Sequence, residues 1–399
     1  MKNLPKMHRG LSLLFRCVIG LFCSIAMQAQ PYSIGHTTIN FTDSSRGNRS
    51  IPTEIYYPSD VDGVDVPMSI LTNEKFPSLT FGHGFLMTWD AYQNIWQTLV
   101  PEGFIMAFPK TEGGFSPSHL DYGKDLAYVS DQIYNLSMLT TTIFSDRVSL
   151  MNAVMGHSMG GGAAFLAAQL NPNIKSIVTL SAAETNPSAI TAAASVTIPA
   201  LVIAGANDCV TPPSTNQVLM YDALNSACKT YVSILGGSHC QMANSNFFCN
   251  FGESTCTPQP TINRTLQHAV INDYAMKWLG AQLKSDCIMG EAMDVLIEND
   301  SRITFQKTCL QCSNLSIASN ALASNFTLFP IPFQDVLFLE GRDDRVSEFL
   351  LYDLSGRKIL TKAFITNATI TTSDLESGIY FYKIVQANQV VKTGKIIKE

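Results

Sequence analysis

The sequence predicts an α/β protein with a mostly parallel, eight-stranded sheet covered by helices on both faces, followed by a small all-β sandwich. Two observations lead to this class. Between residues 33 and 283 short apolar runs alternate with helical patterns, whereas residues 326–399 hold only strand patterns separated by turns. With 46% hydrophobic and 15% charged residues, the 399-residue chain has the composition of a globular protein with a sizeable core.

Eight segments have the composition of strands. Residues 33–41 and 51–58 flank the turn-forming segment TDSSRGNRS, which predicts an antiparallel hairpin. The other six are short apolar runs, typical of strands that are buried on both faces of a parallel sheet. They are residues 76–82, 103–109, 149–156, 175–182, 199–206 and 230–237.

Helical patterns separate these strands. Leu126, Val129, Ile133 and Leu136 follow the three-to-four spacing of an amphipathic helix. We expect further helices within GGGAAFLAAQL and over residues 264–283, after which the alternation fades. Because strands alternate with helices, the sheet is expected to be mostly parallel and covered on both faces.

The composition changes after this first unit. The segment SNLSIASNALASN has no strong apolar period and predicts a linker over residues 313–325. Residues 31–312 are therefore assigned to the first domain. Residues 326–399 are assigned to the sandwich, whose turns are expected at LSGRK and QANQ.

Residues 1–30 have the pattern of a secretory signal peptide, in which an apolar run at 17–27 follows the basic residues Lys2, Lys6, Arg9 and Arg16. The run is shorter than the roughly 20 residues that span a bilayer, so we favour a cleaved signal over a retained anchor. Its removal takes the net charge from −6 to −10, and the chain has no basic stripe that would predict nucleic-acid binding. We expect a secreted monomer with no stable membrane span.

Eight cysteines remain after the predicted signal peptide: Cys209, Cys228, Cys240, Cys249, Cys256, Cys287, Cys309 and Cys312. An even number in an exported chain predicts disulfides, although spacing leaves the connectivity open. A local pairing of Cys209 with Cys228 is one guess. Cys309 and Cys312 form a CxxC, for which we favour structural bridges over redox or zinc chemistry, because no second ligand pair is visible.

The most informative stretch is LMNAVMGHSMGGGAAF, where an apolar run ends in the pentapeptide GHSMG around Ser158. A GxSxG sequence between a strand and a helix is the pattern of a nucleophile elbow. Its tight turn lifts the serine hydroxyl above the sheet, beside the N–H groups of the following helix. The alternative is an ordinary small-residue turn, but the position directly after a strand favours a nucleophilic Ser158.

A serine hydroxyl is a poor nucleophile unless an adjacent base takes its proton. In this sheet order an acid and then a histidine follow the serine, each just past the end of a strand. His239, directly after the last predicted strand, fits the base, with a loop-capping role as its alternative. Asp208, three residues beyond Gly205, fits the acid, and Asp222 in a helical stretch is the runner-up.

Acyl transfer also needs two backbone N–H donors for the developing oxyanion. One is expected from Met159, the residue after the nucleophile. The other is expected from Phe85, in the segment TFGHGFLM after the third strand, unless GHG is an ordinary tight turn. This chemistry requires no metal and no cofactor, and we expect none.

The motifs GHGF, GHSMGGGAAF, GANDCVTPP and GGSHC resemble the α/β-hydrolase family. Within it they are most similar to secreted cutinases, polyester (PET) hydrolases, and chlorophyllase-like and platelet-activating-factor-acetylhydrolase-like esterases. The resemblance covers residues 31–312 and implies the α/β-hydrolase fold. It also implies a triad with two oxyanion donors, which would be Ser158, Asp208, His239, Phe85 and Met159.

The C-terminal segment resembles the type A sorting domain of type IX (Por) secretion. The segments LFPIPFQDVLFLEG, LYDLSGRKIL and LESGIYFYKI carry this resemblance, with Ile331 where asparagine is usual. It implies that the type IX machinery is a partner and that the protein reaches the cell surface or the extracellular space. A carbohydrate- or surface-binding sandwich is the alternative.

The sequence thus predicts a secreted serine hydrolase that cleaves carboxylic esters through an acyl-enzyme. A peptidase, a lipase or acetylhydrolase of the same fold, and a non-catalytic surface-binding protein are the alternatives. Helix and strand signals fill the interval between Ser158 and Asp208, so no cap domain fits there and an open site for a bulky or polymeric ester is expected.

Substrate contacts are expected from the loops around the serine. Phe85, Leu86, Trp89 and Met159 would form apolar walls, unless they are ordinary core residues. Cutinases and PET hydrolases carry a tryptophan soon after the sixth strand, where this chain has Glu184 and Thr185. Glu184 is therefore expected to contact the substrate at this place. The loop CQMANSNFFCNFGESTC after His239 is expected to be tied by disulfides and to form one rim of the site.

Overall fold

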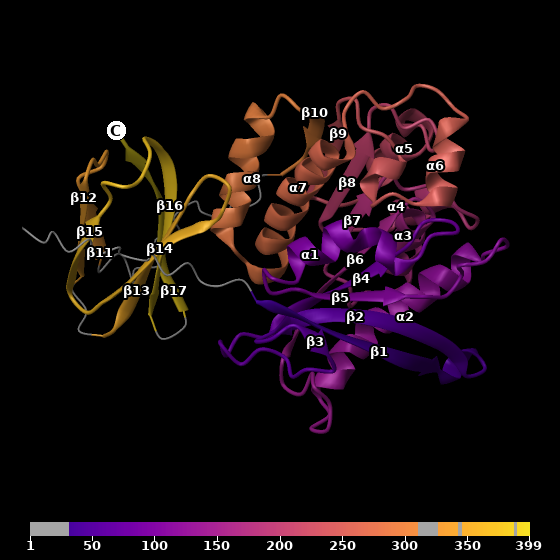
Figure 1. Cartoon of the computed structure of the whole chain (residues 1–399), viewed down its shortest axis with the longest axis horizontal. Helices are drawn as coiled ribbons and strands as arrows, with labels where there is room; N and C mark the ends of the chain where they lie inside the picture. The colour runs from indigo at the N-terminus through magenta and orange to yellow at the C-terminus, as the bar shows by residue number, and fades with distance from the viewer. Residues whose placement is uncertain (1–31, 310–325, 342–344, 387–388) are drawn as a thin grey trace, which may run out of the picture.

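The structure is a computed structural model that describes residues 32–309, 326–341, 345–386 and 389–399 (Figure 1). It contains an α/β domain and an all-β sandwich, as the sequence predicts. The predicted signal peptide, residues 1–30, and the predicted linker, residues 313–325, lie outside the described residues. Within those ranges, no helix combines the length and the apolarity needed to cross a membrane.

The α/β domain is built on one ten-stranded sheet in the order β10-β9-β8-β7-β6-β4-β5-β2-β1-β3. Strands β4 to β9 are parallel, and the β1–β2 hairpin joins them through the antiparallel pairing of β2 with β5. The eight expected strands are β1 (Ser33–Asp43), β2 (Arg49–Ser59), β4 (Phe76–Gly82), β5 (Ile105–Pro109), β6 (Val148–His157), β7 (Ser176–Leu180), β8 (Ala200–Gly205) and β9 (Lys229–Ile234).

Two further strands extend the edges of this sheet. The two-residue strand β3 (Gly63–Val64) pairs with β1, and β10 (Ile303–Lys307) pairs antiparallel with β9 after helix α8 (Cys287–Asn299). The expectation that the alternation fades after residue 283 is therefore wrong. Only Ile303 of β10 is buried, so this edge strand has no continuous apolar run by which to recognise it.

Helices cover both faces of the sheet (Figure 1). One face carries α2 (His119–Ser137), α3 (Met159–Leu170), α4 (Ala189–Ala193) and α5 (Gln217–Ala223), and the other carries α1 (Gln93–Leu99) and α7 (Arg264–Lys284). The strands divide their side chains between the two faces with a period of two. In β8, Leu201 and Ile203 pack with α7, whereas Val202 and Ala204 pack with α3.

The disulfides join Cys209 to Cys256, Cys228 to Cys309 and Cys240 to Cys249. The guess that Cys209 pairs with Cys228 is wrong. Strands β8 and β9 are parallel, and Cys209 follows β8 whereas Cys228 precedes β9, so the two cysteines lie at opposite ends of these strands. Of the described cysteines, only Cys287 has no bridge. The CxxC is not a local pair, and Cys312 lies outside the described residues.

The sandwich consists of two antiparallel sheets packed around an apolar core that includes Phe333, Leu337 and Phe349. One sheet contains β11 (Phe326–Phe329), β12 (Val336–Gly341) and β15 (Asn367–Thr371), and the other contains β14 (Lys358–Phe364), β13 (Ser347–Tyr352), β16 (Gly378–Gln386) and β17 (Gln389–Lys398). It contacts the α/β domain at α8, where Ile288 and Phe381 are buried in a small cluster. Figure 1 shows that α8 lies between the two domains.

Candidate active site

Ser158 occupies the turn between β6 and α3, with a backbone conformation of φ 55° and ψ −123°. Residues other than glycine rarely adopt a positive φ, so the surrounding structure must hold this turn in place. The Ser158 N–H donates to the carbonyl oxygen of Leu180 at 3.0 Å, and the Ser158 carbonyl accepts from the Gly162 N–H at 3.0 Å. Hydrogen bonds on both sides of the serine thus fix the elbow that the sequence predicts.

Glycines allow this turn to lie close to its neighbours. A Cβ on Gly156 would lie 2.2 Å from the carbonyl oxygen of Gly160, and a Cβ on Gly160 would lie 2.1 Å from the carbonyl oxygen of Gly82. Both positions therefore require glycine, because the opposing atoms belong to the backbone and cannot rotate away. The close approach brings the residue 82–86 loop against the start of α3.

The three residues predicted to act together lie together at the carboxyl edge of the sheet. The Ser158 Oγ is 2.9 Å from His239 Nε2, and His239 Nδ1 is 2.8 Å from Asp208 Oδ2. Asp208 and His239 are each 2% exposed and Ser158 is 9% exposed, so the whole row is largely buried and the serine is its most exposed member. The runner-up acid, Asp222, is exposed on α5.

Thr211 completes the surroundings of the carboxylate, and the sequence analysis missed it. Asp208 Oδ1 accepts the N–H groups of Val210 and Thr211, at 3.0 and 2.8 Å. Asp208 Oδ2 accepts the Thr211 hydroxyl at 2.9 Å, and that hydroxyl oxygen lies 3.0 Å from both His239 Nδ1 and Gln217 Nε2. The signal was the spacing Asp-x-x-Thr in GANDCVTPP, in which an aspartate bonds the backbone two and three residues on.

The two predicted oxyanion donors belong to different segments: Met159 directly follows Ser158 at the start of α3, and Phe85 belongs to the loop after β4. Among the described residues, neither the Phe85 N–H nor the Met159 N–H has a hydrogen-bond partner. The two amides that precede Phe85 are held by buried tyrosines, because the His83 N–H donates to Tyr122 and the Gly84 N–H donates to Tyr92, at 2.6 and 2.8 Å. The loop is thus anchored up to residue 84, and the next N–H, that of Phe85, has no partner among the described residues.

The predicted substrate contacts lie in different surroundings. Phe85 is 45% exposed, whereas Met159 is buried. Trp89 is partly buried: its Nε1 donates to the Tyr56 hydroxyl at 3.2 Å, and its ring lies under the ammonium group of Lys110. Exposed Glu184 accepts the Ile190 N–H through Oε2 at 3.1 Å. Of the apolar side chains among them, only Phe85 is exposed.

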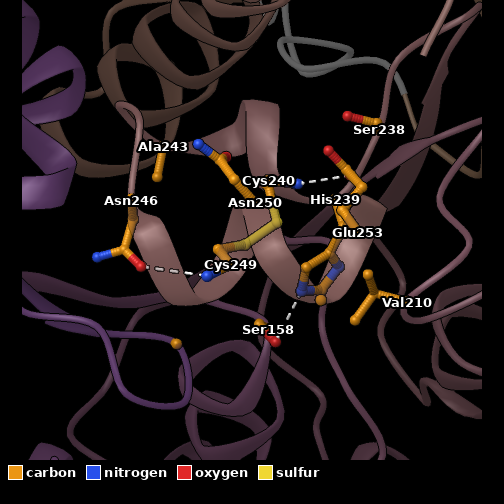
Figure 2. Close-up of a disulfide and its surroundings, with 12 residues drawn as sticks. Ser158, Val210, Ser238, His239, Cys240, Ala243, Asn246, Cys249, Asn250 and Glu253 are labelled. Carbon is orange, nitrogen blue, oxygen red and sulfur yellow. Dashed lines mark hydrogen bonds between the residues drawn. A yellow bond between two sulfur atoms is a disulfide. The ribbon is translucent and has the colours of Figure 1, made fainter. Parts of the chain in front are cut away.

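The loop after His239 contains a helix that the sequence analysis did not predict, α6 (Phe247–Ser254). The Cys240–Cys249 disulfide joins this helix to the residue that follows His239 (Figure 2). From the same helix, Glu253 Oε1 accepts the Cys240 N–H at 2.9 Å. The outer side of the helix carries exposed phenylalanines, with Phe247 75% exposed. The predicted rim is therefore a short helix bonded directly to the histidine loop.

The described residues include no group of three or more His, Cys, Asp or Glu side chains that would hold a metal ion. Lysine and arginine side chains are likewise absent from the hydrogen bonds of Ser158, His239 and Asp208. What the site contains is a hydroxyl, an imidazole and a carboxylate in one row, with unpaired backbone N–H groups nearby. This arrangement is suited to nucleophilic attack on a carbonyl group.

Comparison with known proteins gives matches to both parts of the chain. The PET hydrolase-like family matches residues 26–254, and the secretion system C-terminal sorting domain matches residues 327–399. The second match confirms the sorting domain that the sequence predicts, and with it export to the cell surface or the extracellular space. The domain boundaries at residues 31–312 and 326–399 remain predictions.

Two cutinases are similar to this chain over a shorter stretch. Cutinase 1 of Thermobifida cellulosilytica and Cutinase of Thermobifida fusca (strain YX) are each 32% identical to it over 105 residues, or 26% of this chain. The matched stretch is 38% of the first cutinase and 34% of the second, so the chain spans about a third of the length of these relatives. Because the PET hydrolase-like match covers more than half of the sequence, the protein belongs to the PET hydrolase-like family of α/β hydrolases.

Proposed function

We propose that this protein is an exported serine esterase that cleaves carboxylic esters through an acyl-enzyme on Ser158. The observation that carries the proposal is the row formed by Ser158 Oγ, the His239 imidazole and the Asp208 carboxylate, with contacts of 2.9 and 2.8 Å. An imidazole held by a buried carboxylate is the arrangement that activates a serine hydroxyl for acyl transfer. Membership of the PET hydrolase-like family supports the same reaction.

In the first half of the reaction, His239 Nε2 takes the hydroxyl proton while Ser158 Oγ bonds to the ester carbonyl carbon. The tetrahedral intermediate then expels the alkoxide, which receives that proton from His239 and leaves as the alcohol. In the second half, His239 takes a proton from water as the water oxygen attacks the acyl carbon. The second tetrahedral intermediate then releases the acid, and His239 returns the proton to Ser158 Oγ. Asp208 holds the imidazole in the required tautomer throughout and stabilises its charged form.

The N–H groups of Phe85 and Met159 are proposed to bind the oxyanion of each tetrahedral intermediate. Both are unpaired among the described residues, and Met159 begins α3, so the positive end of the helix dipole adds to its N–H. Such donors stabilise a charge that exists only near the transition state, and losing one typically slows an enzyme by about 10²–10³-fold.

We propose an apolar or polymeric ester as the substrate. Between Ser158 and Asp208 the chain forms only α3, β7, the five-residue α4 and β8, so no cap domain is inserted in this interval. An uncovered site accepts bulky esters, and exposed Phe85 supplies an apolar contact for an acyl or aromatic group. The sorting domain at residues 327–399 is proposed to engage the type IX machinery during export.

A fluorophosphonate label tests the reaction directly. We expect one label per chain on Ser158, no label in Ser158→Ala, and strongly slowed labelling in His239→Ala. Hydrolysis of a p-nitrophenyl ester should fall by roughly 10⁴–10⁶-fold in both variants. The exposed Ser195, on a different loop, supplies the control, because Ser195→Ala should label and turn over as the wild type does.

Substrate assays separate the remaining candidates. A p-nitrophenyl series of increasing acyl length, followed by a polyester film, identifies the preferred ester. An amide with the same acyl group should react far more slowly than the ester, and equal rates would identify a peptidase instead. A folded protein that takes no label and cleaves neither substrate would be a surface-binding protein on a hydrolase scaffold.

A further inference from the structure

A second histidine is buried beneath the site and takes no part in the reaction described above. His157 precedes Ser158 at the end of β6 and is fully buried, as is Tyr92. His157 Nε2 lies 3.1 Å from the backbone carbonyl oxygen of His239, and His157 Nδ1 lies 3.0 Å from the Tyr92 hydroxyl. That hydroxyl accepts the Gly84 N–H at 2.8 Å. An unbroken row of hydrogen bonds therefore runs from Gly84 to His239.

The donors and acceptors in this row have only one consistent arrangement. The His239 carbonyl oxygen can only accept, so His157 Nε2 must carry a hydrogen. Burial and the nearby His239 imidazole hold the pKa of His157 well below its usual range, so the ring is neutral and its Nδ1 is an acceptor. Tyr92 therefore donates to Nδ1 and is left with a lone pair for the Gly84 N–H. Its other neighbour, Met87 Sδ at 3.3 Å, is a much weaker acceptor.

The two ends of the row belong to different parts of the proposed machinery. Gly84 directly precedes Phe85, whose N–H is proposed to bind the oxyanion. The other end is the backbone of His239, the proposed base. His157, in the middle of the row, directly precedes the nucleophile Ser158 in the sequence. Three segments that are far apart in the chain are thus linked through two buried side chains.

The neighbouring amide, that of His83, shows that a buried N–H can be hydrogen-bonded without any connection to the His239 loop. The His83 N–H donates to the Tyr122 hydroxyl at 2.6 Å, and Tyr122 is as fully buried as Tyr92. Tyr122, however, has no hydrogen bond to His157 or to the His239 loop among the described residues. Anchoring the loop is therefore common to both tyrosines, whereas only Tyr92 connects it to the histidine.

We propose that Tyr92 and His157 are positioning residues that fix the Phe85 N–H relative to the His239 imidazole and so couple the oxyanion site to the base. This inference rests on the proposed esterase reaction. The relative position of the Phe85 N–H and the His239 imidazole should affect the energy of the transition state, in which both groups act at once. It should affect substrate binding much less, because binding does not require both groups to be aligned.

Replacing Tyr92 with phenylalanine keeps the ring and removes the central hydroxyl. We expect Tyr92→Phe to lower kcat on a soluble p-nitrophenyl ester by about 10–100-fold, part of the effect of losing an oxyanion donor, with KM changed less than about twofold. The matched control is Tyr57→Phe, because Tyr57 is fully buried on β2 and donates to the Val66 carbonyl at 2.8 Å. It should lower Tm and leave kcat unchanged.

A double-mutant cycle tests whether the two residues act as one unit. His157→Leu should also lower kcat, and His157→Gln should restore part of it, because an amide supplies both a donor and an acceptor. If the row acts as a unit, Tyr92→Phe combined with His157→Leu will be no slower than the slower single variant. Multiplied effects, or an unchanged kcat in Tyr92→Phe, would overturn the proposal.

Nitrogen-15 NMR tests the row without turnover and in the wild-type protein. The proposal requires the Nε2–H tautomer of neutral His157 and a slowly exchanging Gly84 amide, and Tyr92→Phe should speed that exchange. A wild-type protein that shows both signatures but neither labels nor hydrolyses would contradict the proposed function and leave the row intact. The Nδ1–H tautomer of His157 in an active enzyme would contradict the proposed hydrogen-bond row and leave the proposed function intact.

Discussion

The two sides of the site are held in place by different means. The serine side, residues 82–86 and 156–160, contains no cysteine and is fixed by backbone contacts between glycines and by hydrogen bonds to buried tyrosines. The histidine side, residues 205–211 and 237–256, contains two of the three disulfides of the described chain. Cys209 directly follows Asp208, and Cys240 directly follows His239.

This difference follows from the length of the connections. The serine side consists of tight turns that leave parallel strands, and the sheet and the adjoining helix fix such a turn within a few residues. The histidine loop instead runs from β9 through α6 to α7, and ordering a long loop costs more conformational entropy. Cross-links lower that cost by restricting the unfolded chain. The two sides should therefore fail under different changes.

The largest effect is expected from Gly160→Ala, on the serine side. The new Cβ would lie 2.1 Å from the Gly82 carbonyl oxygen, so the elbow and the residue 82–86 loop must separate. We expect esterase activity to be abolished and the free energy of unfolding to fall by about 4 kcal/mol or more. The control is Gly252→Ala on α6, where an added Cβ meets nothing within 4 Å. A stable, active Gly160→Ala protein would show that the glycine contact does not hold this side.

The next effect separates stability from activity. Removing the Cys240–Cys249 disulfide, with a sequence separation of 9, should cost about 2–3 kcal/mol of unfolding free energy. Removing Cys228–Cys309, with a separation of 81, should cost more, about 4–5 kcal/mol. Only the first pair adjoins His239, so paired alanine substitutions should lower kcat strongly at 240 and 249 and little at 228 and 309. Denaturant unfolding and ester hydrolysis measure the two quantities.

Equal losses of kcat in the two disulfide variants, measured well below their unfolding transitions, would contradict this division. Activity would then follow global stability and not the position of the histidine loop.

A smaller effect is expected from Thr211→Val, within the histidine side. Valine keeps the shape but removes the hydroxyl that donates to Asp208 Oδ2 at 2.9 Å. The carboxylate would hold the imidazole less rigidly, so kcat should fall by about tenfold, or about 1.4 kcal/mol, with a small change in KM. Thr215→Val is the control, because Thr215 is exposed on the same loop and bonds only to nearby loop atoms. Identical kcat values in the two variants would show that the Thr211 hydroxyl does not contribute to the reaction.

The serine side was the more predictable from sequence, because its pattern is local. The pentapeptide GHSMG after an apolar run locates Ser158 at the strand–helix turn, and the order of strands then leads to Asp208 and His239. Ser158 directly follows β6, and Asp208 and His239 lie in the loops that follow β8 and β9. These strands are buried, and buried strands produce the strongest apolar runs. The predicted fold and the grouping of the three side chains depend only on these runs and on the parallel order.

Apart from Thr211, whose spacing from Asp208 is local, the features that the sequence did not reveal depend on contacts between distant segments. Cys228 bonds to Cys309 because β10 runs antiparallel to β9, and β10 itself has too little buried surface to be recognised. Tyr92 belongs to a short helical segment whose pattern suggests only core packing, and its hydroxyl acquires a role through His157, 65 residues away. Helix α6 contains polar residues and glycine, and it forms where two disulfides and the Glu253 carboxylate hold it.

The smallest effect is an acid sensitivity of the serine side. Burial holds the pKa of His157 well below its usual range and also lowers the pKa of His83. A histidine with a lowered folded pKa is neutral in the folded state and gains its proton on unfolding, so its stability is present above the unfolded pKa of about 6.5 and is lost as the pH falls. The partly buried His268, beside Ala243 on the histidine side, also has a lowered pKa, because of burial, and adds to this loss.

Denaturant unfolding at two pH values measures how much the lowered pKa of His157 contributes to the free energy of unfolding. Between pH 7 and pH 6, His157 should account for a loss of about 0.7 kcal/mol in the free energy of unfolding. His157→Gln should remove that part of the pH dependence, whereas His119→Gln, at a partly exposed position that bonds the Asn186 N–H, should keep it. If His157→Gln keeps the full dependence on pH, the imidazole is already protonated in the folded protein, and it would then have no acceptor for Tyr92.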